Sequence, residues 1–517
     1  MDEVYKRIND DTEMLDTCTD ASEIEQFYAG QCVFLTGSTG FIGKSVVEKL
    51  LRTCANLKKL YILVRAKKGS SPTERLKKYL KDDFFNELRK TVPDFEKKIV
   101  LIEGDLSENG IGLSIIDRHS LIEEVNIVVH NAANVKFDIK VELALRINVL
   151  GTQSVLDLVS QCKNIKAFVY VSTAYSNCIY TDIEEKFYPS PADLKMVNDM
   201  IKADLETPNG INKAALKMLL GDIPNIYVFS KATAENFVKD YSKKVNFPCA
   251  VFRPSIVAST YKEPVAGWCG NLNGPAAGII GYALGIIHTV FMTDSPIDLV
   301  PVDMCANALI AIPWYIVDNK KEEKTASVFN YGTSVTNPIN VKACINWGYT
   351  HGSENPSIKM VWDCFIITTS NYWLWLFLEI FLHFIPAIIA DVVLLTRGKK
   401  PMAVNGYFKI VRYFGIVRYF LNGIWRIHVT EMQKLWDRLK PHDKKKFHCD
   451  LREIDWMYFS SLYWNGLRVY ILKEPMDTVP IARKRFARLR LYNKILFIFL
   501  SLLLIYTLNR FIRYICI

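Results

Sequence analysis

Apolar residues in the first part of the chain occur in short runs, and helical patterns lie between them. The runs occupy residues 33–36, 60–64, 99–103, 127–129 and 168–171. After the first run, apolar side chains recur at positions 42, 46, 47, 50 and 51, which is the spacing of one helix face. Short buried strands that alternate with helices are typical of α/β proteins. The pattern therefore predicts a Rossmann-like, doubly wound parallel sheet.

The end of the chain carries a longer apolar run. Residues 495–508 are uncharged, and six basic residues precede them between positions 483 and 494. These fourteen residues fall short of the roughly twenty that span a bilayer, although Lys494 and Arg510 can reach the headgroups and the bilayer can thin locally. We expect a spanning membrane helix, and the alternative is a helix in the membrane plane. Because basic residues gather on the cytoplasmic side, the rest of the protein is expected in the cytosol.

Composition and charge argue against several classes of protein. The formal net charge is +10, but residues 481–517 alone hold eight Lys or Arg and no acid, so we expect a membrane contact and no nucleic acid.

The twelve cysteines include no Cys-x-x-Cys pair, and His442, His448 and Cys449 lack the spacing of metal ligands, so neither disulfides nor a metal site are expected. This cysteine usage indicates a reducing compartment. Residues 1–27 carry nine acidic and two basic side chains, which indicates a weakly ordered acidic N-terminal arm and no secretory signal.

Residues 33–43 read Val-Phe-Leu-Thr-Gly-Ser-Thr-Gly-Phe-Ile-Gly, in which a strand turns into a helix through three glycines. Gly37 permits a tight turn, Gly40 lets the backbone approach a pyrophosphate, and Gly43 allows close packing of helix on strand. The N-terminus of the helix favours phosphate. We therefore predict a dinucleotide site, and the alternative is a glycine-rich loop without a ligand. The residues of this loop expected to contact the cofactor are Thr36, Gly37, Ser38, Thr39, Gly40, Phe41, Ile42 and Gly43.

The ends of the next strands narrow the choice of cofactor. An acidic residue after the second strand selects NAD by binding the ribose 2′-hydroxyl, but this chain has Arg65 there, followed by two lysines. A guanidinium can bind the 2′-phosphate of NADP through two hydrogen bonds, so we predict NADPH. A solvated basic turn is the alternative. Asp105, Asn131 and Ala132 follow the third and fourth strands, where further cofactor contacts are expected.

Candidate catalytic side chains lie further along the chain. Tyr227 and Lys231 are four residues apart at the start of a predicted helix, so both side chains lie on one face. An ammonium beside a phenol favours the phenolate, so we expect Lys231 to lower the pKa of Tyr227 and to bind the nicotinamide ribose. The fifth strand ends in Ser172 and Thr173, and either can supply a hydroxyl partner. A tyrosine and a lysine at this spacing are common on helices, but after a dinucleotide turn they indicate a site for proton transfer.

These motifs resemble those of the extended short-chain dehydrogenases/reductases and, among them, the animal-type fatty acyl-CoA reductases. Further segments that carry the resemblance are Tyr61-Ile-Leu-Val-Arg65, Val171-Ser-Thr-Ala-Tyr175, Arg253-Pro-Ser-Ile-Val257, Lys262-Glu-Pro264, Gly267-Trp268, Asn271-Leu-Asn-Gly-Pro275 and Leu299-Val-Pro-Val-Asp303. The likeness extends from about residue 28 to about residue 475 and includes a downstream domain. It implies that Thr173, Tyr227 and Lys231 are the catalytic residues, with Ser172 as a second candidate for the hydroxyl.

The resemblance implies NADPH-dependent reduction of a long-chain fatty acyl-CoA to the primary alcohol with release of CoA, which supplies precursors of ether lipids or waxes. Basic residues near Lys262 are candidates for binding the CoA phosphates. One alternative is a sterol or nucleotide-sugar dehydrogenase of the same superfamily, which needs neither the downstream domain nor the apolar tail. The other is a catalytically silent lipid-binding scaffold, which leaves the triad unexplained. Chain-length preference, oligomeric state and organelle stay open, and endoplasmic reticulum, peroxisome and lipid droplet are all compatible with the sequence.

Four parts of the chain are expected. They are an acidic arm (1–27), an NADP-binding reductase domain (28–350), a mainly helical C-terminal domain (351–475) and a basic juxtamembrane segment with the membrane helix (476–517). Residues 372–395 of the helical domain are long and apolar enough to cross a bilayer, but they include Glu379, His383, Pro386 and Asp391, whose burial in lipid costs several kcal/mol. We therefore expect helices with an apolar face turned to the acyl chain, the membrane surface or the reductase domain. A buried core helix is the alternative.

Overall fold

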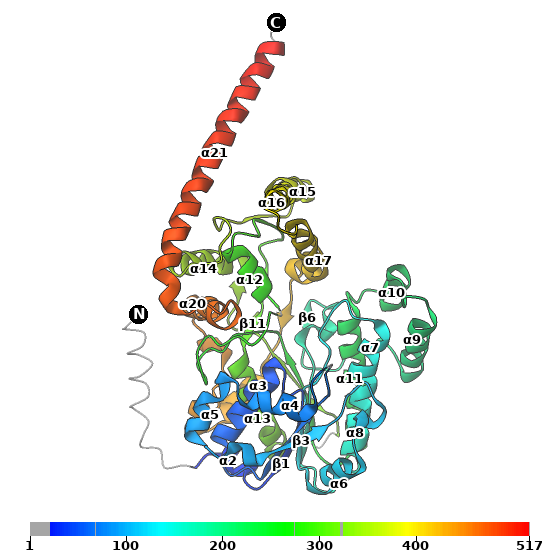
Figure 1. Ribbon diagram of the computed structural model, residues 1–517. Coiled ribbons are helices and arrows are strands. Elements are labelled where there is room, and N and C mark those ends of the chain that lie inside the picture. Colours follow the sequence, from blue (N-terminus) through cyan, green and yellow to red (C-terminus); the bar gives the residue numbers. More distant parts are fainter. Residues whose placement is uncertain (1–20, 68, 273, 321–323, 516–517) are drawn as a thin grey trace. The chain divides into compact units, whose positions relative to one another are not determined.

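The computed structural model describes residues 21–67, 69–272, 274–320 and 324–515 of the 517-residue chain (Figure 1). It divides into two compact units. We call them the sheet unit (Met1–Val265, Asp298–Asn337 and Trp425–Ile454) and the helical unit (Ala266–Ile297, Pro338–Ile424 and Asp455–Ile517). The predicted domains are continuous stretches of sequence, whereas each unit consists of three segments, so the predicted boundaries stay a prediction.

The sheet unit is built on seven parallel strands in the order β12, β7, β5, β4, β1, β2, β3. The strands are β1 (Cys32–Thr36), β2 (Lys59–Val64), β3 (Ile99–Glu103), β4 (Ile127–His130), β5 (Ala167–Val171), β7 (Cys249–Pro254) and β12 (Ser327–Tyr331). The order reverses between β1 and β4, which is the property that defines a doubly wound sheet. The predicted Rossmann-like fold is confirmed.

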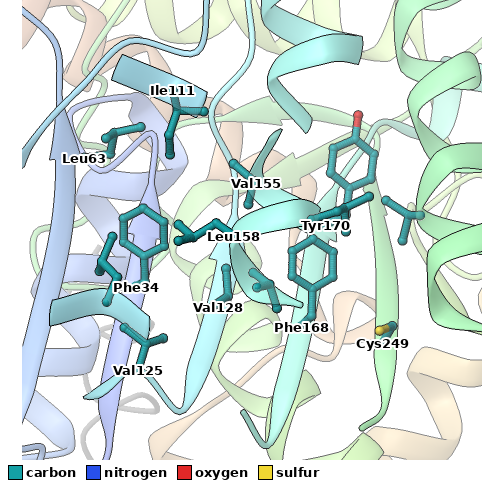
Figure 2. Close-up of a cluster of buried hydrophobic side chains, with 14 of the residues drawn as sticks. Phe34, Leu63, Ile111, Val125, Val128, Val155, Leu158, Phe168, Tyr170 and Cys249 are labelled. Atoms are coloured by element: carbon teal, nitrogen blue, oxygen red, sulfur yellow. The ribbon is translucent and has the colours of Figure 1, made fainter. Parts of the chain in front are cut away.

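Helices cover this sheet on both faces, which explains why its strands are nearly continuous apolar runs rather than alternating ones. Every residue of β1, β4, β5 and β7 is buried. Figure 2 shows Phe34, Val128 and Phe168 from three of the strands beside Val155 and Leu158 of a covering helix. The helices of the unit are α2 (Glu23–Tyr28), α3 (Phe41–Thr53), α4 (Pro72–Leu80), α5 (Asn86–Thr91), α6 (Ile115–Glu124), α7 (Val141–Leu145), α8 (Gly151–Val159), α9 (Leu194–Glu206), α10 (Lys213–Leu220), α11 (Ile226–Ser242), α13 (Val302–Asp318), α18 (Thr430–Arg438) and α19 (Pro441–Lys446). Two small pairs of parallel strands complete the sheet unit. They are β8 (Ile256–Ala258) with β11 (Leu299–Pro301), and β6 (Asp182–Ile183) with β15 (Arg426–Ile427).

The predicted acidic arm lies mostly outside the described residues, which begin at position 21. The end of the arm differs from the expectation of weak order, because residues from Glu23 onward form α2. Ile24 is buried, and the Tyr28 hydroxyl donates a hydrogen bond to the Ile310 carbonyl on α13 at 2.9 Å. Burial of these apolar and aromatic side chains holds the segment on the sheet unit.

The helical unit contains most of the exposed apolar surface. Its helices are α12 (Ala276–Ala283), α14 (Val341–Glu354), α15 (Tyr372–Glu379), α16 (Ile385–Thr396), α17 (Ala403–Asn422), α20 (Trp456–Gly466) and α21 (Val479–Ile515), and its strands are the pairs β9 (Thr289–Phe291) with β14 (Ile367–Thr369) and β10 (Pro296–Ile297) with β13 (Ile339–Asn340). Two stretches, Tyr372–Thr396 and Met476–Tyr514, are long and apolar enough to cross a membrane, and almost none of the most apolar part of either is buried. The alternative of a buried core helix at residues 372–395 is therefore wrong. Figure 1 shows α21 extending away from the rest of its unit.

Candidate active site

The glycine turn has the geometry that the sequence predicts. Thr36 ends β1, residues 37–39 form the turn, Gly40 is the N-cap of α3, and Phe41, Ile42 and Gly43 form its first turn. Gly37 has φ +71°, and a Cβ there would lie 2.8 Å from the Ala132 backbone nitrogen. A Cβ on Gly43 would lie 2.1 Å from the Gly37 carbonyl oxygen. Both positions therefore require glycine because the backbone segments lie too close for a side chain.

The turn is joined to the end of β4 by the Thr36 hydroxyl. Its oxygen accepts hydrogen bonds from the backbone nitrogens of Asn131 and Ala132, each at 3.1 Å. The predicted contact residues of β1 and β4 thus lie together at the point where the strand order reverses, and this is where dinucleotides bind in such sheets. Ser38 adds a buried hydroxyl that has no hydrogen-bond partner among the described residues. A buried donor without a partner, next to the N-terminus of α3, fits a phosphate group.

Arg65 and Asp105 lie together at the ends of β2 and β3. The Arg65 guanidinium is 3.7 Å from the Asp105 carboxylate, and its side chain is 59% exposed. A second arginine, Arg75 on α4, donates a hydrogen bond to the Arg65 carbonyl oxygen. Burial and the neighbouring charge of Arg65 both lower the pKa of Arg75. Two guanidinium groups at the edge of the cofactor region are suited to a phosphate monoester.

The candidate catalytic side chains gather at the carboxyl end of β5. Tyr227 and Lys231 lie on the first turns of α11, and Ser172 and Thr173 directly follow the strand. The Tyr227 phenol is hydrogen-bonded to the Thr173 side chain. Lys231 Nζ donates to the Val171 carbonyl at 2.6 Å. The Ser172 hydroxyl is buried without a partner among the described residues, so Thr173 is the hydroxyl that contacts the tyrosine.

Burial controls the protonation of this group. It lowers the pKa of Lys231 to about 7, although the charge of Glu235 acts to raise it. Burial also raises the pKa of Tyr227 above its usual value, and the hydrogen bond from Thr173 opposes that effect. The predicted lowering of the Tyr227 pKa by Lys231 is therefore wrong for this structure, because desolvation of the phenolate is the largest influence and Lys231 is not among the groups that shift this pKa. Tyr227 is a neutral phenol near neutral pH and can donate a proton.

The family of the chain follows from comparison with known proteins. An NAD-binding family model described as male sterility protein matches residues 35–309, and a second model with the same description matches residues 382–474. The chain is 35% identical over 493 residues to "Fatty acyl-CoA reductase wat" of Drosophila melanogaster, which covers 94% of this chain and 93% of the relative. The chain belongs to the fatty acyl-CoA reductase family. Residues 35–309, which include the glycine turn, are accordingly its NAD(P)-binding part.

Other members and one solved structure agree with this assignment. "Fatty acyl-CoA reductase 1" of Homo sapiens is 34% identical over 474 residues, with 90% of both chains covered. The crystal structure of the terminal R domain from the myxalamid PKS-NRPS biosynthetic pathway has a TM-score of 0.56 at 18% identity and covers 87% of this chain and 93% of that one. At that identity the likeness shows the fold alone.

The structure of this fatty acyl-CoA reductase family member adds a buried chain of polar groups that the sequence did not reveal. Lys231 Nζ donates to the Tyr170 hydroxyl at 3.3 Å, and the Thr152 side chain on α8 is close enough to Tyr170 to act on its pKa, lowering it against the larger effect of burial. His130 Nε2 lies 3.0 Å from the Thr152 hydroxyl, and its Nδ1 lies 2.8 Å from the Thr36 hydroxyl. Burial lowers the pKa of His130 to about 3, so the ring is neutral. The chain connects the lysine with the glycine turn.

Two further buried contacts fix α11, and sequence reasoning missed both. Asn148, in a π-helical turn (Arg146–Leu150), donates to the Asn134 carbonyl at 3.0 Å and to the Ser230 hydroxyl at 2.9 Å. Glu235 forms an ion pair with Arg253 of β7 at 2.6 Å, and both side chains are almost fully buried. The sequence gives no indication of the partners of Asn148, which is an asparagine inside a helical pattern. Arg253 and Glu235 each stand in an apolar pattern, where an unpaired charge would be costly, so the sequence could have indicated that they pair.

The remaining predictions concern metals and CoA. Among the described residues, no group of three or more His, Cys, Asp or Glu side chains is placed to hold a metal ion. Lys262 is exposed, with Nζ 5.7 Å from the centre of the Tyr261 ring. Its role as a CoA contact in this reductase family member stays a prediction.

Proposed function

We propose that this protein is an alcohol-forming fatty acyl-CoA reductase that uses NADPH. Membership of the family over nearly the whole chain supports this activity most directly, because the relatives carry that name. The hydrogen-bonded Tyr227 and Thr173 and the buried Lys231 supply the proton chemistry that such a reduction needs. The substrate is a long-chain acyl-CoA, and the product is a primary fatty alcohol.

The glycine turn and the strand ends would hold the cofactor. The backbone of residues 37–43 and the Ser38 hydroxyl are suited to the pyrophosphate, since the turn leads into the N-terminus of α3 and holds a buried hydroxyl without a partner among the described residues. Arg65 and Arg75 are suited to the 2′-phosphate that distinguishes NADPH from NADH. When bound, NADPH supplies the hydride for each reduction.

Tyr227 acts as the acid. Reduction of a thioester carbonyl places negative charge on its oxygen, and the neutral phenol donates a proton to that oxygen. Thr173, hydrogen-bonded to the phenol, holds it in place and helps to stabilise the charge. Lys231 would bind the ribose of the cofactor from the same face of α11 as Tyr227, which lies one helical turn away.

The same site serves twice. Protonation of the first oxyanion gives a hemithioacetal, which loses its hydroxyl proton to the departing CoA thiolate and leaves an aldehyde and free CoA. Tyr227, reprotonated from solvent, donates a second proton when the aldehyde is reduced to the alcohol. These two reduction steps require no second acid, in agreement with the one tyrosine and lysine that stand four residues apart on α11.

The C-terminal helix α21 supports membrane anchoring. Its apolar residues between 495 and 508 are exposed, and basic residues precede them. An exposed apolar helix of this length buries its surface favourably in lipid. We infer a spanning anchor with both units in the cytosol, where acyl-CoA is available; the organelle follows from neither the fold nor the family.

The activity is tested by incubating purified full-length protein with palmitoyl-CoA and either NADPH or NADH, followed by identification of the lipid product. We expect hexadecanol and free CoA with NADPH and far less with NADH. Reduction of NADP+ by a sterol or a nucleotide sugar, with no alcohol from palmitoyl-CoA and NADPH, would assign the chain to another dehydrogenase class. No turnover of any of them, with acyl-CoA binding retained, would favour a lipid-binding scaffold.

A further inference from the structure

The segment formed by α15, the π-helical turn Ile380–Phe384 and α16 carries the largest exposed apolar surface of the described helical unit apart from α21. Its side chains that are more than half exposed are Trp373, Phe377, Phe381, Ile389, Val392 and Leu395. Trp373 is 75% exposed, and the Phe377 and Phe381 rings pack on each other at 4.5 Å without being covered. Contiguous apolar surfaces of this kind mark sites of interaction.

Two of the residues that argue against lipid contact, Glu379 and His383, are turned into the protein, and a third, Asp391, is engaged by backbone hydrogen bonds. Glu379 is 7% exposed and accepts a hydrogen bond from His383 Nδ1 at 2.9 Å, while His383 Nε2 accepts one from the His288 backbone nitrogen at 2.8 Å. The Asp391 carboxylate accepts the backbone hydrogen bonds of Met402, Ala403 and Val404 at the start of α17, at 2.7 to 3.0 Å. Burial of Glu379 and His383 removes these two groups from the exposed face of the segment, so their desolvation adds little when that face meets lipid, whereas Asp391 on α16 stays partly exposed with its carboxylate hydrogen-bonded to the start of α17.

These contacts also decide how the segment can lie. The hydrogen bond between His383 and the His288 backbone is near the middle of Tyr372–Thr396. A helix tied to the protein body at its midpoint cannot cross a bilayer, but it can lie along the surface with its outer face in the boundary between headgroups and acyl chains. Tyr372, Trp373 and Trp375 at its start are the residue types enriched at that boundary.

Charge indicates which surface the segment meets. Residues 397–424, directly after α16, contain six Lys or Arg and no Asp or Glu. Arg397, Lys399 and Lys400 are exposed in the turn between α16 and α17. A basic flank beside an apolar face is complementary to anionic lipid headgroups.

A stack of rings joins this segment to the C-terminal helix. His383 stacks on His288 with ring centres 5.8 Å apart, and His288 stacks on Phe365 at 4.3 Å. Phe365 contacts Phe497 of α21 at 5.8 Å, close to where the apolar run of that helix begins at residue 495. The apolar surfaces of α15, α16 and α21 are therefore connected within one unit.

We propose that α15 and α16 form a second membrane contact, which lies in the plane of a bilayer with anionic headgroups while α21 anchors the chain. The contact holds the helical unit against the bilayer surface. It is independent of the catalytic proposal, since none of its residues belongs to the candidate active site.

Tryptophan fluorescence provides the test, because α21 contains no tryptophan. Full-length protein is reconstituted in phosphatidylcholine–phosphatidylglycerol vesicles with or without bromine on the acyl chains, and protein that floats with the vesicles is measured. We expect brominated lipid to quench part of the emission, and W373F to remove at least half of the quenched part. W436F, which changes a partly buried tryptophan of the sheet unit, is the matched control and should leave the quenched part unchanged.

Other outcomes separate the alternatives. Floating protein with no quenching that depends on Trp373 would overturn the proposal, whereas protein that fails to float would count against the α21 anchor. Substituting Trp373, Phe377 and Phe381 by serine should reduce the quenching at least threefold and leave the oligomeric state unchanged. If that variant instead converts a dimer to a monomer, the face is an interface between copies of the chain and the proposal is wrong. The matched control is I115S/I116S, which removes two exposed apolar residues of α6.

Discussion

At the scale of single residues, the proposed chemistry depends on the environment of one phenol. Tyr227 is only partly covered, with the Phe137 ring stacked on it at 5.6 Å, yet desolvation is enough to keep it protonated. The sequence predicts the tyrosine, the lysine and the glycine turn, because each depends on local spacing. It does not predict that Lys231 also contacts Tyr170, since that contact joins α11 to a neighbouring strand and leaves no periodic trace.

Replacing Tyr227 by phenylalanine tests the proton donor. The ring and its stacking on Phe137 are kept, so the fold should survive, while loss of the acid should lower turnover by about a hundredfold or more. Alcohol formation from palmitoyl-CoA is compared with the wild type, and thermal unfolding serves as the control for folding. Near wild-type turnover would place the proton donor elsewhere.

Arg65 determines the predicted preference for NADPH. In R65D a carboxylate replaces the guanidinium beside Asp105, so the 2′-phosphate meets repulsion in place of hydrogen bonds. NADPH binding should weaken by about 2 kcal/mol or more, the value of a charged hydrogen bond, whereas NADH should bind as well as before or better. Titration of both nucleotides gives the answer, and equal losses for the two would mean that Arg65 supports the local structure only.

At the scale of elements, buried polar contacts fix α11 against the sheet. The alternation of strands and helices is predictable because both faces of a parallel sheet must be covered, and the apolar runs follow from that requirement. The π-helical turn around Asn148 is not predictable, because its asparagine bonds to Asn134 and Ser230, which are distant in sequence. Likewise, the spacing of Glu379 and His383 shows that they share a helix face but not that this face is turned inward.

The ion pair between Glu235 and Arg253 provides a test of this scaffold. In R253M the Glu235 carboxylate stays buried without its partner, which should lower the free energy of unfolding by about 3–5 kcal/mol. Denaturant unfolding measures the loss. The matched control is R426M, which breaks an exposed pair with Asp182 and should change stability far less. A loss in R253M no larger than that of R426M would show that α11 is held by its apolar packing alone.

At the scale of the whole molecule, the chain separates its chemistry from its lipid contacts. All the candidate catalytic and cofactor residues belong to the sheet unit, whereas both long apolar helices belong to the helical unit. The sequence reveals both apolar segments but gives no way to distinguish a spanning helix from one that lies in the membrane plane. That distinction depends on which side chains the fold turns inward.

Deleting residues 495–517 tests this division of roles. The segment removed supplies the exposed apolar run of α21, while the basic residues that remain contribute only about 1 kcal/mol each near anionic lipid. Carbonate washing should therefore release the truncated protein from membranes, since α15 and α16 provide a peripheral contact without a span. The truncated protein should still reduce detergent-dispersed palmitoyl-CoA, because Thr173, Tyr227 and Lys231 are untouched, but it should be less active in cells, where its substrate arrives through the bilayer. Fractionation decides the matter: truncated protein that stays in the carbonate-resistant pellet would make Tyr372–Thr396 a true span, and the in-plane contact would be wrong.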